Sequence, residues 1–320
     1  MNPYVFLVGC LRSGTTLLQR IADAHPDIAV IHETQWIPRS YERRVGLAPD
    51  GTVTPDLARR LVEHPRFGRM ELEPEAVADL CAGGGMHFRR YVGDLFDLHG
   101  KAKGKRLVGE KSPGYVRHIP TLHELWPRAR IVHLIRDGRD VCLSARAWRK
   151  AERILGRYPT WRDEEVTTAA LWWEWHVRLG RESGAGLDDD LYLEVSYEAI
   201  VADPEAECAR LCEFLAVPYD DAMLRFHEGR TRSRPGLGAK AAWLPVTAGL
   251  RTWRTEMPGD DLVRFEAATG PLLDELGYAR AVPAPEERDV HRAEQLRRRF
   301  DASLIARGRP VPAAWAERVA

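Results

Sequence analysis

Neither sign of charge dominates this chain, and it has no long apolar run. Its 320 residues include 47 Lys and Arg against 47 Asp and Glu, so the formal net charge is zero. A balanced chain lacks the general positive field that attracts nucleic acid or an anionic membrane, and we predict neither partner. No stretch reaches the roughly 20 apolar residues that cross a bilayer. The apolar run Tyr4–Leu11 is cut off by Arg12 and has no basic segment before it, which argues against export and favours a cytoplasmic location.

Cysteine is scarce as well. The five cysteines, an odd number, are Cys10, Cys81, Cys142, Cys208 and Cys212. Because Cys208 and Cys212 lie one helical turn apart in an apolar pattern, we expect buried thiols rather than a disulfide or a zinc site. The 11 histidines show no pair spaced to bind a metal from one helical face, so we predict no metal.

Apolar runs of strand length alternate with segments of helical periodicity. The expected strands are Tyr4–Val8, Ile28–Ile31, Arg106–Gly109, Ala129–Ile135 and Leu191–Val195. Helical patterns begin at Thr15 and cover Arg117–Trp126, Glu164–Arg181, Pro204–Leu215 and Asp260–Leu276. Strands that alternate with helices form parallel sheets covered by helices. We therefore predict a three-layer α/β fold of the P-loop type, with a central, mainly parallel sheet flanked by helices.

Two segments depart from this alternation. Residues 38–105 are rich in Arg, Pro and Gly, and we expect them to form a lid of helices and loops over one edge of the sheet. After Pro283 and Pro285 the chain becomes highly charged, and Glu286–Arg299 is predicted to be a solvated helix. The predicted organisation is one domain over residues 1–280 and a C-terminal helical extension over residues 281–320.

A glycine-rich loop follows the first strand and opens the first helix. Its sequence is Gly9-Cys10-Leu11-Arg12-Ser13-Gly14-Thr15-Thr16, and in this position backbone N–H groups can cradle a phosphate. Compared with the nucleotide-binding P-loop, Thr15 occupies the lysine position and the only cation has moved to Arg12. A kinase needs that lysine and Mg²⁺ to neutralise the transferred phosphoryl group, whereas a sulfuryl group carries less charge. The loop is therefore compatible with sulfuryl transfer.

Two motifs together resemble the sulfotransferases that use 3′-phosphoadenosine 5′-phosphosulfate (PAPS). The loop of that family reads Arg/Lys-Ser-Gly-Thr-Thr, and Arg12–Thr16 match it. The second family motif, a strand followed by Arg-Asp-Gly-Arg-Asp and a serine on the next helix, is matched by Ile131–Ile135, Arg136–Asp140 and Ser144. An arginine at the strand end and a hydroxyl two helical turns later can face one phosphate.

The resemblance implies a donor site and its residues. It places Arg12, Ser13, Gly14, Thr15 and Thr16 on the 5′-phosphosulfate, Arg136 and Ser144 on the 3′-phosphate, and Tyr197 against the adenine. The implied donor is PAPS, the implied product is adenosine 3′,5′-bisphosphate, and no metal takes part.

One branch of the family is more similar than the others. The stretch His32-Glu33-Thr34-Gln35-Trp36-Ile37-Pro38-Arg39 resembles the Glu-Thr-Arg-x-Ile-Pro-Arg segment that carries the catalytic carboxylate of the tyrosylprotein branch. The resemblance makes Glu33 the general base. Its position after the second strand also places it at the carboxyl edge of the sheet, beside the phosphate loop, where ligands bind in open α/β folds.

A lysine follows the third expected strand. Glu110-Lys111-Ser112-Pro113 resembles the Glu-Lys-Ser/Thr-Pro stretch of carbohydrate sulfotransferases. By that resemblance Lys111 contacts the transferred sulfuryl group and stabilises charge on the bridging oxygen. Small-phenol sulfotransferases carry a catalytic histidine two residues after the equivalent lysine, but Pro113 stands there, so that scheme supplies no base.

The last family loop and a tryptophan-rich helix are harder to assign. Candidates for the basic residues that close over the donor are Arg232, Arg234, Lys240 and Arg254. Leu244 stands where the tyrosylprotein pattern has lysine, so none of these cations is chosen. Trp172, Trp173 and Trp175 cannot all face one way on a helix. Most are expected in the core, and one is a candidate for the acceptor cleft.

The leading hypothesis is therefore sulfuryl transfer from PAPS to an acceptor hydroxyl, with Glu33 as base and Arg12 and Lys111 as catalytic cations. Tyrosyl, carbohydrate and small-metabolite hydroxyls are all open as acceptors, and the oligomeric state is open too. The rival enzyme is a nucleotide-dependent phosphotransferase (a kinase) with a degenerate P-loop. The rival from another class is a nucleotide-binding module without catalysis, although the presence of both Glu33 and Lys111 argues against it.

Overall fold

Five strands form one parallel sheet in the order β2-β3-β1-β4-β5. The computed structural model describes residues 3–82, 85–228, 244–247, 252–313 and 315. The strands are β1 (Val5–Gly9), β2 (Ile28–His32), β3 (Leu107–Lys111), β4 (Arg130–Ile135) and β5 (Tyr192–Ser196). Each lies within two residues of its predicted position. The predicted α/β fold with a central parallel sheet between helices is confirmed.

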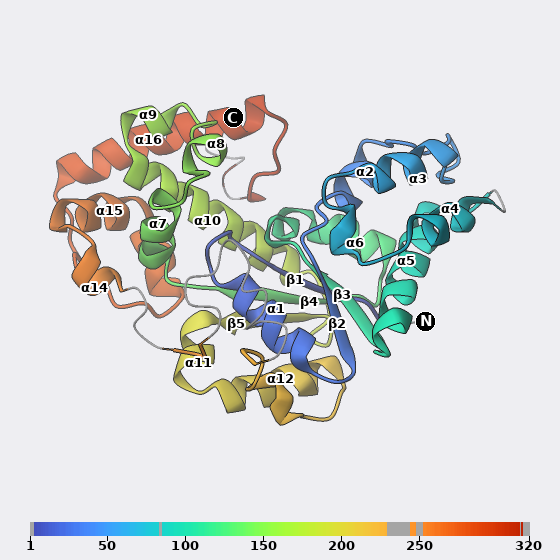
Figure 1. The fold of residues 1–320 in the computed structure, drawn as a ribbon. Coiled ribbons are helices and arrows are strands. Elements are labelled where there is room, and N and C mark those ends of the chain that lie inside the picture. Colours follow the sequence, from blue (N-terminus) through green and yellow to red (C-terminus); the bar gives the residue numbers. More distant parts are fainter. Residues whose placement is uncertain (1–2, 83–84, 229–243, 248–251, 314, 316–320) are drawn as a thin grey trace.

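The central strand β1 is buried on both faces because helices cover each side of the sheet. Alternate residues of a strand point to opposite faces. Val5 and Leu7 pack in one layer with α1 (Thr15–Ala24) and α12 (Pro204–Leu215). Phe6 packs in the other layer with α5 (Phe88–Lys103) and α6 (Ile119–Leu125). Figure 1 shows these two pairs of helices on opposite sides of the sheet.

In chain order the other helices are α2 (Ile37–Glu42), α3 (Pro55–Val62), η1 (Phe67–Arg69), α4 (Pro74–Ala82), η2 (Pro113–His118), α7 (Gly138–Arg146), α8 (Ala151–Ile154), α9 (Thr160–Asp163), α10 (Glu165–Gly184), α11 (Tyr197–Ala202), η3 (Asp221–Met223), α14 (Trp253–Glu256), α15 (Gly259–Glu275) and α16 (Glu287–Ala306). Of these, α10, α15 and α16 lie where periodicity predicted a helix. The insertion over residues 38–105 contains α3, η1, α4, α5 and most of α2. Its last helix, α5, packs against β2 and β3.

Two expectations change. The helix predicted to be solvated, α16, packs against α10 and α15 and buries Leu296, Phe300 and Leu304. Its sequence has few apolar positions, but they recur at helical spacing, so the helix buries an apolar face and its charged residues, apart from the buried Asp301, lie on the other side. The tryptophans of α10, Trp172, Trp173 and Trp175, are all at most 2% exposed, so none lines an open cleft. Neighbouring helices surround α10 on several sides, and it therefore buries more than one face.

Parallel strands bring their carboxyl ends to one edge of the sheet. There β1 ends at Gly9, β2 at His32, β3 at Lys111, β4 at Ile135 and β5 at Ser196, and ligands of open α/β folds bind at this edge. Within the described part of the chain, none of the helices combines the length and the apolar composition that crossing a bilayer requires.

Candidate active site

The phosphate loop connects β1 to α1 through a strained backbone. Arg12 has φ 77° and Gly14 has φ 99°, and this left-handed conformation costs a residue with a side chain roughly 1–2 kcal/mol. Strain of this kind gathers at ligand sites. A Cβ atom on Gly14 would lie 2.5 Å from the ring of Tyr197, so only glycine fits this approach. The first turn of α1 follows directly and presents N–H groups and the positive end of its dipole.

Three distant segments meet at this loop. Arg12 Nε donates to Ser144 Oγ at 3.1 Å, which ties the loop to α7. The guanidinium of Arg136 lies over the ring of Tyr197, 4.2 Å from its centroid, and the same ring packs against Gly14. The residues predicted to bind the two ends of the donor therefore lie together, not in separate cavities.

Of the two arginines in the second motif, one lies beside the phosphate loop and one in the core. Arg136 is held by its carbonyl, which accepts from Trp173 Nε1 at 3.1 Å, and by Asp140, which its guanidinium contacts at 3.2 Å. Arg139 is 1% exposed and pairs with Glu266 at 2.7 Å. Arg139 therefore stabilises the fold, and Arg136 faces Tyr197.

Two buried polar atoms of the predicted donor motifs have no hydrogen bond within the described structure. In the described part of the chain, Ser13 Oγ and Arg136 Nε have no hydrogen-bond partner. An unsatisfied buried polar atom costs roughly 1–3 kcal/mol, and a ligand with several acceptor oxygens would remove that cost.

The predicted base and the predicted catalytic lysine form an ion pair. His32 and Lys111 are register partners at the ends of β2 and β3, and the Glu33 amide donates to the Lys111 carbonyl at 2.8 Å. Lys111 Nζ donates to Glu33 Oε1 at 2.6 Å and to Thr16 Oγ1 at 3.3 Å. The Lys111 side chain is 0% exposed and that of Glu33 is 21% exposed. Lys111 thus connects the carboxylate to the phosphate loop.

The pair fixes the protonation of its members. Burial by itself raises the pKa of Glu33, but the charge and hydrogen bond of Lys111, helped by His32 and Arg69, bring it below its ordinary value. Burial lowers the pKa of Lys111, against the opposing pull of Glu33. Burial and the charge of Lys111 lower the pKa of His32 to about 4. At neutral pH the site therefore holds an ionised carboxylate and a neutral His32.

Two arginines of the insertion hold the backbone of Glu33. Arg66 and Arg69 each donate to the Glu33 carbonyl, at 2.9 and 3.0 Å, and Arg69 also lies 3.8 Å from Glu33 Oε2. Nothing in the sequence indicated this role, since both residues lie in an arginine-rich insertion about 35 positions after Glu33. The contact depends on how η1 packs beside β2.

A match over most of the chain decides the family. Residues 3–221 match the family model described as "Sulfotransferase family". This chain belongs to the sulfotransferase family. The predicted resemblance is thereby confirmed, and a kinase is not favoured.

Named relatives lie in the tyrosylprotein branch. A protein-tyrosine sulfotransferase of Drosophila melanogaster is 26% identical over 286 residues, which are 86% of this chain and 52% of that protein. Protein-tyrosine sulfotransferase A of Caenorhabditis elegans is 26% identical over 285 residues, 87% of this chain and 67% of that protein. The chain therefore spans about half the length of the first relative and two thirds of the second.

Two solved structures share the fold. The sulfotransferase domain of the Synechococcus PCC 7002 olefin synthase is similar with a TM-score of 0.58 and 24% identity, covering 87% of this chain and 95% of that domain. The sulfotransferase domain from the curacin biosynthetic pathway has a TM-score of 0.58 and 20% identity, covering 87% of this chain and 99% of that domain.

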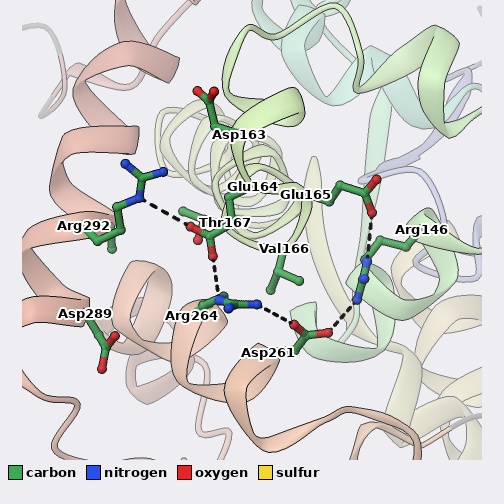
Figure 2. Close-up of a pocket in the computed structure, with 11 residues that line it drawn as sticks. Arg146, Asp163, Glu164, Glu165, Val166, Thr167, Asp261, Arg264, Asp289 and Arg292 are labelled. Atoms are coloured by element: carbon green, nitrogen blue, oxygen red, sulfur yellow. Dashed lines mark hydrogen bonds and ion pairs between the residues drawn. The ribbon is translucent and has the colours of Figure 1, made fainter.

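A cavity of about 550 Å³ lies elsewhere in this member of the family, between α7, α10, α15 and α16. Figure 2 shows its arginines joined to carboxylates, with Arg264 contacting both Asp261 and Glu164 at 3.2 Å and Arg146 contacting Asp261 at 2.7 Å. No predicted site residue lines it, and its cations are already paired. The cavity is therefore no candidate for the donor.

Most of the basic residues predicted to close over the donor lie in a part of the chain that the structure does not describe. Arg232, Arg234 and Lys240 lie outside the described residues, while Arg254 lies over the ring of Trp253 at 4.5 Å.

Cys10, Cys142, Cys208 and Cys212 are buried free thiols, as predicted, and the side chain of Cys81 is not among those described. Among the described side chains, no three of His, Cys, Asp or Glu are grouped as metal ligands.

Proposed function

We propose that this protein transfers a sulfuryl group from PAPS to a hydroxyl, with a tyrosyl side chain as the first acceptor to test. The observation that carries the proposal is Lys111, which contacts both Glu33 and Thr16 and so joins a carboxylate base to a phosphate loop. Family membership supports the reaction class, and the names of the relatives support the tyrosyl acceptor. The cytoplasmic location and the division into two parts at residue 280 stay predictions.

The donor motifs fit PAPS chemically. Among the described residues, Ser13 Oγ and Arg136 Nε are buried without hydrogen-bond partners, and a phosphate offers the acceptors they need. Gly14 lets Tyr197 approach the loop, so an aromatic ring lies near the arginine assigned to the 3′-phosphate. When bound, PAPS supplies a sulfuryl group activated by its link to the 5′-phosphate. Arg12, the N-terminal turn of α1 and Ser144 would hold the two phosphate ends.

Glu33 performs the proton transfer in this proposal. Its carboxylate accepts the proton of the acceptor hydroxyl while that oxygen bonds to sulfur and the bond from sulfur to the 5′-phosphate oxygen breaks. Arg12 and Lys111 stabilise the negative charge that moves onto the leaving phosphate. The hydroxyl proton ends on Glu33, and the sulfuryl group ends on the acceptor.

The Glu33–Lys111 pair implies that Lys111 changes partner. While Lys111 donates to Glu33 at 2.6 Å, it lowers the pKa of that carboxyl and weakens it as a base. A donor phosphate beside Thr16 competes for the ammonium, and Lys111 is already 3.3 Å from the Thr16 hydroxyl. Movement of Lys111 toward the phosphate raises the basicity of Glu33 when the donor is present.

The surroundings of Glu33 favour an acceptor with negative charge. Arg66 and Arg69 hold the Glu33 carbonyl, and burial together with the charges of Arg69 and Arg153 lowers the pKa of Arg66. The charges of Arg69 and Arg153 thus both act on the Arg66 guanidinium. Among the described side chains, Arg69 is the one of these three arginines that lies within salt-bridge distance of a carboxylate, that of Glu33. An acceptor with carboxylates near its hydroxyl would reduce this repulsion.

Donor binding is expected to depend on Arg136. Arg136→Ala removes a charge-assisted contact to a phosphate, each worth about 1.5–3 kcal/mol, so adenosine 3′,5′-bisphosphate should bind roughly 10- to 150-fold more weakly. Calorimetry measures this. Arg130→Ala, at the opposite end of β4, where the side chain donates to the Leu215 carbonyl, is the matched control and should bind as the wild type does. Equal affinity in the two variants would remove Arg136 from the donor site.

The acceptor preference is expected to be electrostatic. A tyrosyl peptide flanked by aspartates should have a KM about 10-fold lower than its asparagine analogue at low salt, and the gap should close as ionic strength rises. Arg153→Gln should reduce the gap, whereas Arg225→Gln, on a distant surface paired with Asp221, should not. Steady-state transfer of ³⁵S-labelled sulfate measures each KM, and an equal preference for both peptides would contradict the proposal.

One calorimetric series separates the proposed function from its rivals. A sulfotransferase binds adenosine 3′,5′-bisphosphate without Mg²⁺, whereas a kinase binds ATP with Mg²⁺. A binding module without catalysis would bind the bisphosphate and transfer no sulfate from labelled PAPS to any hydroxyl.

A further inference from the structure

Glu110 is a completely buried carboxylate next to the active lysine. It is 0% exposed and precedes Lys111 on β3, so the two side chains point to opposite faces of the sheet. One of its oxygens, Oε1, accepts hydrogen bonds from the Thr34 amide at 2.8 Å, the Thr34 hydroxyl at 2.9 Å, the Gln35 amide at 3.3 Å and the Ser112 hydroxyl at 2.5 Å. Burial raises its pKa, and the hydrogen bonds of Ser112 and Thr34 oppose that shift.

These hydrogen bonds hold the turn that carries the base. Glu33 has φ 47° and Gln35 has φ 63°, and this left-handed conformation is unfavourable for residues that carry a side chain. The second oxygen, Oε2, accepts from the Tyr115 hydroxyl at 3.4 Å, which itself accepts from the Ile37 amide at 3.2 Å. Glu110 therefore holds Thr34 and Gln35 directly and Ile37, the first residue of α2, through Tyr115.

The geometry leaves Glu33 little backbone freedom. Its amide is bonded to the Lys111 carbonyl, its carbonyl accepts from Arg66 and Arg69, and the next two amides are bonded to Glu110. An apolar side chain in place of a buried charge is often as stable or more stable. Stability therefore does not explain the carboxylate at position 110. The strained turn Glu33–Gln35, which Glu110 holds in place, does explain it.

We propose that Glu110 is a positioning residue, which holds the strained turn Glu33–Gln35 and thereby aims the Glu33 carboxylate at Lys111 and at the acceptor hydroxyl. The proposal rests on the proposed function, in which Glu33 is the base. Glu110 itself touches neither substrate, because the turn and Tyr115 enclose it.

The test replaces Glu110 by its isostere. Glu110→Gln keeps one acceptor oxygen but loses the negative charge, so the hydrogen bonds from Thr34, Gln35 and Ser112 weaken. Its amide nitrogen also cannot accept from Tyr115. The turn therefore loosens and Glu33 separates from Lys111. We expect kcat for labelled sulfate transfer to fall about 10- to 100-fold, with the affinity for adenosine 3′,5′-bisphosphate unchanged. Because Lys111 lowers the pKa of Glu33 in the wild type, the acid limb of the kcat/KM profile should move to higher pH.

A matched control separates positioning from stability. Glu174 is also a buried carboxylate, on α10, where it accepts from Arg178 at 2.7 Å and Arg297 at 2.6 Å. Glu174→Gln should lower the melting temperature without moving the acid limb. If Glu110→Gln keeps wild-type kcat, or loses kcat with the acid limb unmoved, as a merely structural role predicts, the proposal is overturned.

Two further measurements keep the outcome decisive. If Glu110→Gln does not fold, Thr34→Val serves in its place, because it removes one hydrogen bond to Glu110. It should move the acid limb in the same direction by a smaller amount, and no movement would overturn the proposal.

A ¹³C NMR titration of labelled glutamate, assigned with Glu33→Gln, reports the Glu33 pKa without turnover. A wild type that transfers no sulfate while the Glu33 pKa rises in Glu110→Gln would defeat the proposed function and retain the positioning role.

Discussion

Glu33→Gln is expected to lower kcat for sulfate transfer by about 10²- to 10⁴-fold, the range that a positioned general base contributes. Glutamine keeps the size of the side chain but cannot take the acceptor proton. The donor motifs lie around Arg12, Arg136 and Ser144, so the affinity for adenosine 3′,5′-bisphosphate should change by less than about threefold. Single-turnover transfer from labelled PAPS and calorimetry on the same preparation measure the two quantities.

The control for this variant is Glu63→Gln. Glu63 lies exposed directly after α3, paired with Arg59 at 2.9 Å, and its loss should leave kcat unchanged. Undiminished transfer by Glu33→Gln would show that another group takes the proton. A parallel loss of donor affinity would instead assign Glu33 to binding.

Lys111→Met is expected to lower kcat by about 10²- to 10³-fold, as the loss of one preorganised cation from a charge-stabilising site does. Methionine fills the same buried volume without charge, so the fold should persist. The variant also has a distinct pH signature. Without Lys111 the burial of Glu33 is opposed less, its pKa rises, and the carboxylate is lost at a higher pH on acidification. The acid limb of the kcat/KM profile should therefore move to higher pH. A simple loss of active enzyme would instead lower kcat/KM at every pH and leave the limb in place.

Lys105→Met, just before the start of β3, is the control for Lys111→Met at its end. Lys105 precedes β3, and its ammonium donates to the Ile28 carbonyl at 3.0 Å. Lys105→Met should reduce stability and leave the pH profile in place. If Lys111→Met gives the wild-type acid limb with reduced kcat, the two residues are not coupled during turnover, and the proposed exchange of partner is wrong.

Local sequence predicted the sheet and the placement of the motifs well. Buried parallel strands read as short, β-rich apolar runs, and the crossover rule then brings their ends to one edge. That is why Glu33, directly after β2, was expected beside the phosphate loop before any contact was known, whereas the role of Lys111 at the end of β3 came from the family resemblance. His32 is the register partner of Lys111. Glu33, the next residue after His32, therefore lies close enough to pair with Lys111.

Other features depend on packing between segments far apart in the chain. The charged composition of α16 indicated a solvated helix, yet Phe300 and Leu304 pack into the core with the helices around α10. The roles of Arg66 and Arg69 require η1 to lie against the β2 turn. Local periodicity carries no information about which surface a helix meets.

By itself, the sequence determined the parallel α/β sheet, the phosphate loop with a displaced cation, and the family to which the chain belongs. Each of these follows from short runs of neighbouring residues. The tertiary structure alone decided that Arg12 meets Ser144, that Arg136 stacks on Tyr197, and that Glu110 fastens the turn of Glu33. These contacts join residues from 61 to 132 positions apart. Distances of that kind are set by how strands and helices pack in three dimensions, and no local pattern encodes them.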